Sequence, residues 1–159
     1  MNEDWVAVVQ AKLVTMNRYL SELEERLPDD EGSYLADRDC QLAVERLCQL
    51  TVECAIDTNV LLLDGLGQLP PQSAREGFEN LEQLGVLDST IARLFYTTFV
   101  GFRHRLVVVH EVTTERSEHD YEHLNNRIVY RTAQMLLNAT RQYIGTISAF
   151  LAQRETNTK

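Results

Sequence analysis

The fold is decided by residues 3–27, which read EDWVAVVQAKLVTMNRYLSELEERL. Apolar side chains recur in this stretch at steps of three and four, the spacing that places them on one face of an α-helix. They are Trp5, Val8, Val9, Leu13, Met16, Leu20, Leu23 and Leu27. The segment 28–33 combines proline, glycine and acidic residues and is expected to end this helix. One long amphipathic helix therefore opens the chain.

The same helical spacing continues through the middle of the chain. A second helix is expected from about Asp37 to Leu63, and the glycines and prolines of 64–71 end it. Ser73 and Glu76 have the spacing of a capping box, which predicts a short helix that reaches about Leu84. Gly85 is expected to close that helix.

Two further helices are expected in the second half. Asp88 or Ser89 caps a helix that runs through the phenylalanines at 95, 99 and 102. Ser117 opens the last long helix, and the tail from about Glu155 is expected to be disordered. The sequence thus predicts that residues 1–159 form a single all-α domain, an up-and-down bundle of about five helices. The helix at 73–84 is too short to cover the apolar stripes of the long helices, so a homodimer is expected.

The composition argues against a membrane-spanning protein, a secreted protein and a cysteine-based metal or disulfide site. No apolar run approaches the length of a membrane span, and the acidic N-terminus lacks the basic and apolar regions of a secretory signal. Cys40, Cys48 and Cys54 are odd in number and lack Cys-x-x-Cys spacing, so reduced core cysteines are expected. A cytoplasmic protein without a membrane association fits these features.

The candidate catalytic residues lie in residues 103–110, which read RHRLVVVH. Arg103 and His110 are seven residues apart, so on a helix of about 100° per residue they lie on one face, two turns apart. Residues 99–110 contain no acid, although the whole chain has a net charge of −9. A guanidinium matches the geometry of a phosphate, and a histidine transfers protons near neutral pH. The pair therefore suits cleavage of a phosphodiester in RNA, whose 2′-hydroxyl is the nucleophile.

A structural explanation of the same residues stays open. Arginine and histidine near a helix C-terminus are also favoured by the helix dipole. His104 and Arg105 are candidate RNA contacts, and Glu53 or Asp57 on the preceding long helix could orient Arg103 or His110. His119 and His123 are four apart on the last helix, but no third ligand is in view, so no metal and no cofactor is expected.

The chain resembles the HepT-type toxins of the HEPN superfamily over about residues 38–131. The resemblance rests on the order and spacing of short blocks together with the Arg-x6-His motif. These blocks are Ala43–Arg46, Glu53–Asp57, Leu69–Pro71, Phe78–Leu81, Leu84–Leu87, Gly101–His104 and Val109–Glu111. The family motif is an arginine, a polar residue directly after it, and a histidine four to six residues further on. Arg103, His104 and His110 occupy those positions.

The resemblance implies a homodimer whose two motifs meet in a cleft, metal-independent ribonuclease activity and a toxin role. It also implies a partner, a nucleotidyltransferase antitoxin of the MNT type that AMPylates a toxin tyrosine. The family tyrosine is usually two residues after the histidine, where this chain has Val112. Tyr121 and Tyr96 are the tyrosines nearest the motif, and the sequence does not decide between them. Two alternatives stay open: a non-catalytic helical adaptor of a nucleotidyltransferase, and a structural bundle without a ligand.

Overall fold

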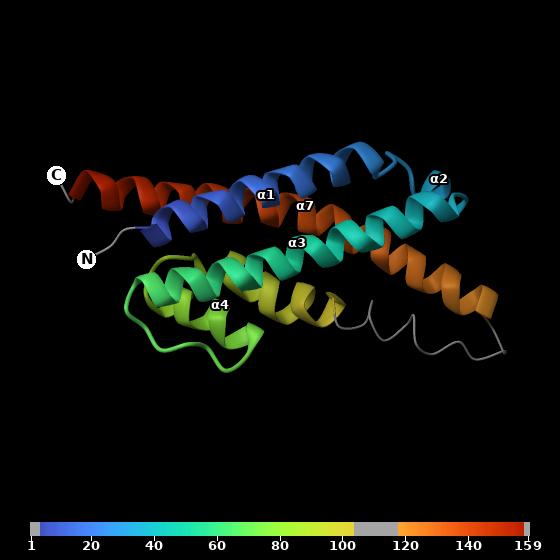
Figure 1. The fold of residues 1–159 in the computed structure, drawn as a ribbon. Helices are drawn as coiled ribbons and strands as arrows, with labels where there is room; N and C mark the ends of the chain where they lie inside the picture. Colours follow the sequence, from blue (N-terminus) through green and yellow to red (C-terminus); the bar gives the residue numbers. More distant parts are fainter. Residues whose placement is uncertain (1–3, 104–117, 158–159) are drawn as a thin grey trace.

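The chain folds as a bundle of helices (Figure 1). The computed structural model describes residues 4–103 and 118–157, and it describes side chains in the last helix from Asn126 onward. No β-strand occurs in these ranges, which confirms the predicted all-α class. Within the same ranges, no helix combines the length and hydropathy that crossing a bilayer requires.

Three long helices form the frame of the bundle. They are α1 (Asp4–Arg26), α3 (Arg38–Gly65) and α7 (Glu118–Asn157). Helix α1 packs on both others and runs antiparallel to them, and the two ends of the chain lie at the same end of the bundle (Figure 1). Shorter helices below α3 in this view are α4 (Ala74–Gln83), α5 (Ser89–Leu94) and the π-helix η1 (Phe95–Phe99).

The predicted helix starts are confirmed by side-chain caps. The Asp37 carboxylate accepts a hydrogen bond from the Cys40 amide at 3.1 Å at the start of α3. The Ser73 hydroxyl oxygen accepts one from the Glu76 amide at 3.0 Å at the start of α4. Of the two caps considered for α5, the structure uses Asp88. These side chains satisfy amides that have no partner inside their helices.

One helix was not expected. Helix α2 (Glu31–Leu35) occupies part of the segment that was predicted as a break, and Asp30 caps it by accepting from the Ser33 amide at 2.9 Å. With α5 and η1 counted as one continuous helix, the described residues form six helices rather than about five. Five residues are too few for a periodic apolar pattern, so the sequence carried no helical signal here.

The last helix also extends further than expected. We expected the chain to be disordered from about Glu155, but α7 continues to Asn157. Leu151 is buried, and the guanidinium of Arg154 lies over the indole ring of Trp5, 5.4 Å from the ring centroid. These contacts hold the final turns of α7 against α1.

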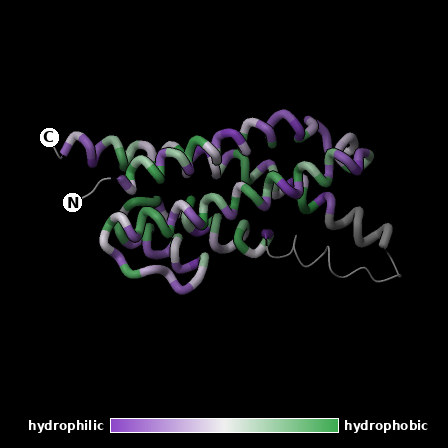
Figure 2. Tube along the Cα trace, in the orientation of Figure 1, coloured by the Kyte–Doolittle hydropathy of each residue, from purple (hydrophilic) through white to green (hydrophobic). Residues whose placement is uncertain are grey.

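Hydrophobic and hydrophilic residues alternate along each long helix, as Figure 2 shows. The apolar faces meet in one core whose largest fully buried side chains include Met16, Tyr34, Phe78, Phe95 and Tyr143. Polar contacts inside this core tie α7 to the other helices. Tyr143 donates a hydrogen bond to the Asn59 side-chain oxygen at 2.6 Å, and Asn126 donates one to Gln41 at 3.2 Å.

Candidate functional site

The helix that carries Arg103 is anchored by aromatic side chains. Phe95 and Phe99 are fully buried in η1, with their ring centroids 5.0 Å apart, and Phe95 stacks on Phe78 of α4 at 4.9 Å. Phe102, one turn further, is 2% exposed. A π-turn widens the helix here, and such turns occur often at functional sites. The phenylalanines fix the rotation and depth of this helix, and therefore the position of Arg103.

Arg103 itself is half-buried, and its Nε atom is shielded from solvent. This Nε has no hydrogen-bond partner within the described residues. A buried donor without a partner costs about 1–3 kcal/mol, and more on a charged group, so an acceptor supplied by a ligand would be bound favourably. A phosphate oxygen is such an acceptor.

Several predicted site residues cannot be placed. His104, Arg105 and His110 lie outside the described residues, as does the side chain of Tyr121. The shared helix face of Arg103 and His110 therefore stays a prediction.

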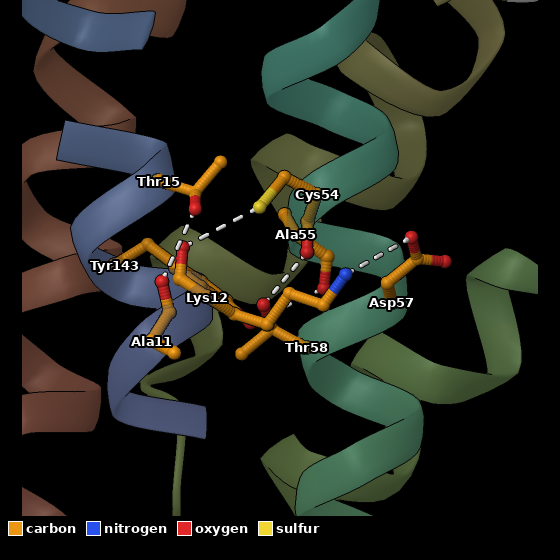
Figure 3. Close-up of polar contacts among 8 residues, drawn as sticks. All are labelled: Ala11, Lys12, Thr15, Cys54, Ala55, Asp57, Thr58 and Tyr143. Atoms are coloured by element: carbon orange, nitrogen blue, oxygen red, sulfur yellow. Dashed lines mark hydrogen bonds and ion pairs between the residues drawn. The ribbon is translucent and has the colours of Figure 1, made fainter. Parts of the chain in front are cut away.

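The two candidate carboxylates of α3 have other contacts. Glu53 accepts a hydrogen bond from the Gln49 amide nitrogen at 3.2 Å. The Lys12 side chain extends from α1 toward Asp57, and its ammonium nitrogen is 3.9 Å from an Asp57 carboxylate oxygen (Figure 3). The Lys12 side chain is 39% exposed and the Asp57 side chain 63%, so solvent screens the pair and it contributes little to stability. Neither carboxylate contacts Arg103 in the part of the chain that the structure describes, and their role as orienting groups stays a prediction.

Tyr96 has an environment that the sequence did not reveal. It lies in η1, is half-buried, and has the guanidinium of Arg75 over its ring, 4.7 Å from the centroid. Arg75 comes from α4, and its Nε donates to the Glu79 carboxylate at 2.6 Å. A contact between side chains 21 positions apart has no local signature, so no sequence pattern could have found it.

The three cysteines are free thiols, as expected. Cys48 and Cys54 are buried and Cys40 is half-buried. Burial raises the pKa of all three thiols, since it disfavours the charged thiolate. Among the described residues, no group of three histidine, cysteine or acidic side chains could hold a metal ion. The cysteines therefore serve the core rather than a reactive site.

Comparisons with known proteins agree with this fold. A family model described as "Ribonuclease HepT-like" matches residues 16–147. A tRNA nuclease HepT from Aphanizomenon flos-aquae (strain 2012/KM1/D3) is 26% identical over 148 residues, which cover 93% of this chain and 92% of that protein.

Two solved structures share the architecture. A tri-AMPylated HEPN toxin of Shewanella oneidensis, in complex with an MNT antitoxin, matches with a TM-score of 0.73 and 23% identity over 94% of this chain and 99% of that one. YutE of Bacillus subtilis, a cytosolic protein of unknown function, matches with a TM-score of 0.73 and 17% identity over 93% of this chain and 91% of that one.

Proposed function

Because the chain belongs to the HepT-like ribonuclease family, we propose that it is an endoribonuclease that acts without a metal ion. We propose further that it is the toxin of a toxin–antitoxin pair. The relative named as a tRNA nuclease makes tRNA the first substrate to test. An enzyme with this substrate acts in the cytoplasm, which is the compartment we propose.

The observation that carries this proposal is the buried, unpartnered Nε of Arg103. In the proposed reaction the guanidinium binds the scissile phosphate and stabilises the charge that develops on its oxygens. His110 transfers a proton, either from the 2′-hydroxyl or to the leaving 5′-oxygen. His104 and Arg105 contact the RNA beside them.

A homodimer completes this mechanism. One protomer supplies one copy of the motif histidine, whereas acid–base cleavage of RNA uses two proton-transfer groups. A two-fold interface brings the second Arg103 and His110 to the same cleft.

A nucleotidyltransferase antitoxin of the MNT type is the partner that we propose. The fold is shared with a HEPN toxin that is bound to such an antitoxin and AMPylated. Attachment of AMP would add a negative charge and a bulky group to the toxin, and both oppose the binding of RNA.

The test is cleavage of purified total tRNA, followed on a denaturing gel in the presence of EDTA. Arg103→Ala and His110→Ala should each lower the cleavage rate by about 10²-fold or more, because each removes a group that acts in the transition state. Arg93→Ala is the matched control, since Arg93 lies on the same helix but is exposed and 3.8 Å from Glu82. Its activity should equal that of the unmodified sequence.

Two results would contradict the proposal. Full activity of the Arg103 or His110 variant would remove that residue from the mechanism, and a strict Mg²⁺ requirement would exclude the metal-free reaction. If the unmodified protein binds tRNA but leaves it intact, the helical adaptor is the correct reading instead. Circular dichroism of each variant checks that the helices are retained.

A further inference from the structure

An arginine of α4 lies over a tyrosine ring of η1 and is held there by an ion pair. The guanidinium carbon of Arg75 is 4.7 Å from the centroid of the Tyr96 ring, and the Arg75 Nε donates to a Glu79 carboxylate oxygen at 2.6 Å. Although the ring covers one side of the guanidinium, the Arg75 side chain is 62% exposed. Solvent therefore reaches the side that faces away from the ring, and Arg75 presents an open plane whose orientation is fixed in advance.

This contact lies beside the helix flank that leads to Arg103. Tyr96, Val100 and Arg103 are half-buried and follow one another at steps of four and three on the helix that ends in Arg103. Tyr96 and Arg103 are therefore separated by about 10 Å along the helix axis. Stacked nucleotides of one strand are about 3.4 Å apart, so an RNA bound at Arg103 can place a base about three nucleotides away over Arg75.

The charges around Arg75 favour an uncharged group rather than a phosphate. Helix α4 carries three carboxylates, Glu76, Glu79 and Glu82, and Arg75 is its one basic residue. These carboxylates repel an anion at this position. A nucleobase is neutral, and a guanidinium plane stacks on bases as it does on aromatic rings. The surroundings of Arg75 therefore suit the base of a nucleotide better than its phosphate.

We propose that Arg75 binds an unpaired base of the RNA substrate, which stacks on the guanidinium from the side opposite Tyr96. Tyr96 and Glu79 are positioning residues, because they act by holding the plane of Arg75. The inference rests on the proposed function, since it adds a base-binding position to the site that holds the scissile phosphate at Arg103. Only an unstacked base has a face free for such a contact, so the position selects single-stranded RNA.

The test separates base stacking from phosphate binding with two probes that the protein cannot cleave. One is a decamer of 2′-O-methyladenosine, which lacks the 2′-hydroxyl nucleophile, and the other has the same sugar–phosphate chain without bases. We expect Arg75→Ala to raise the Kd of the adenosine decamer about tenfold and to leave the Kd of the abasic decamer unchanged, because only the stacked base is lost. Arg103→Ala should raise both Kd values, because both probes carry the phosphates.

Conservative variants test the geometry of the stack. Arg75→Lys keeps the charge but has no plane, so its Kd for the adenosine decamer should match that of Arg75→Ala. Tyr96→Leu should weaken binding in the same way, whereas Tyr96→Phe keeps the ring and should bind like the unmodified protein. Arg18→Ala is the matched control and should also bind normally, because Arg18 lies over the Tyr19 ring at 5.6 Å but belongs to α1. Circular dichroism checks that each variant is folded.

The same variant has a kinetic signature in the cleavage of tRNA. A base held on Arg75 is bound equally in the ground state and in the transition state, since it takes no part in the bond changes. Arg75→Ala should therefore raise KM about tenfold and leave kcat nearly unchanged, whereas Arg103→Ala lowers kcat. A fall in kcat without a change in KM would contradict the proposed role of Arg75.

Failure of this inference is distinct from failure of the proposed function. An unchanged Kd in Arg75→Ala, or no binding of either decamer by the unmodified protein, would overturn the inference. An equal loss for both decamers, or full rescue by lysine, would make Arg75 a phosphate contact instead. Cleavage of tRNA by the unmodified protein is measured in parallel, so each of these results leaves the nuclease proposal standing. Conversely, the expected Kd pattern in a protein that leaves tRNA intact would support the base-binding position and reject the nuclease.

Discussion

At the scale of single residues, Gly65 shows why one position accepts no side chain. It is the last residue of α3, and a Cβ built on it would overlap the indole ring of Trp5. The same ring is covered by the guanidinium of Arg154, so α1, α3 and α7 meet at Trp5. The absence of a Cβ at Gly65 allows this close approach.

Gly65→Ala should therefore destabilise the protein by about 1–3 kcal/mol, the usual cost of forcing extra volume into a packed contact. Urea denaturation followed by circular dichroism measures the change. Gly145→Ala is the matched control, because its Cβ would meet nothing within 4 Å and it lies exposed inside α7. That variant should be more stable by about 0.5–1 kcal/mol, since alanine has the higher helix propensity. Equal stability of the two variants would contradict the proposed packing of Trp5 on Gly65.

At the scale of elements, the helix formed by α5 and η1 connects a local cap to the candidate site. Asp88 accepts a hydrogen bond from the Ile91 amide at 3.1 Å and starts the helix. Phe95, Phe99 and Phe102 then hold it against the core, and Arg103 follows directly. Arg103 lies about three to four turns beyond the capped first turn of this helix.

Asp88→Ala should lower the free energy of unfolding by about 1 kcal/mol, the usual cost of losing an N-cap. Asp88→Asn keeps the acceptor oxygen and loses only the favourable negative charge at the helix N-terminus. It should therefore lower the free energy of unfolding by only a few tenths of about 1 kcal/mol. Chemical denaturation of the three proteins at neutral pH compares them. The prediction is wrong if alanine and asparagine are equally costly.

At the scale of the whole molecule, burial of ionisable groups sets how stability depends on pH. Burial raises the pKa of Cys48 and Cys54 and the pKa of the Tyr143 phenol. Above the pKa of an unfolded thiol, about 8.5, the unfolded chain has lost protons that the folded chain still holds. Stability is therefore fully present below that pH and falls as the pH rises.

The free energy of unfolding should be lower by about 1–3 kcal/mol at pH 9.5 than at pH 7.5, with the cysteines as the main cause. Urea titrations in the presence of a reducing agent measure it. Cys48→Ala should flatten the dependence by about 1 kcal/mol, because it removes the fully buried thiol. An unchanged slope in that variant would show that another group titrates.

The sequence by itself determined where most helices start and end. Caps such as Ser73 and Asp88 act on amides three residues away, and Gly85 ends its helix with a φ of 74°. These are local interactions, so a short window of sequence contains both partners. The Arg103–His110 motif was likewise predicted from a short window of sequence, and it stays a prediction.

Only the tertiary structure decided which side chains meet. Val8 was expected on the inner face of α1, yet it is 45% exposed, and Val6 is buried because α3 and α7 contact that side. The pairing of Lys12 with Asp57 and of Arg75 with Tyr96 joins different helices. Such contacts depend on how the helices rotate and cross when the core packs, and a helical period does not specify the partner that a face will meet.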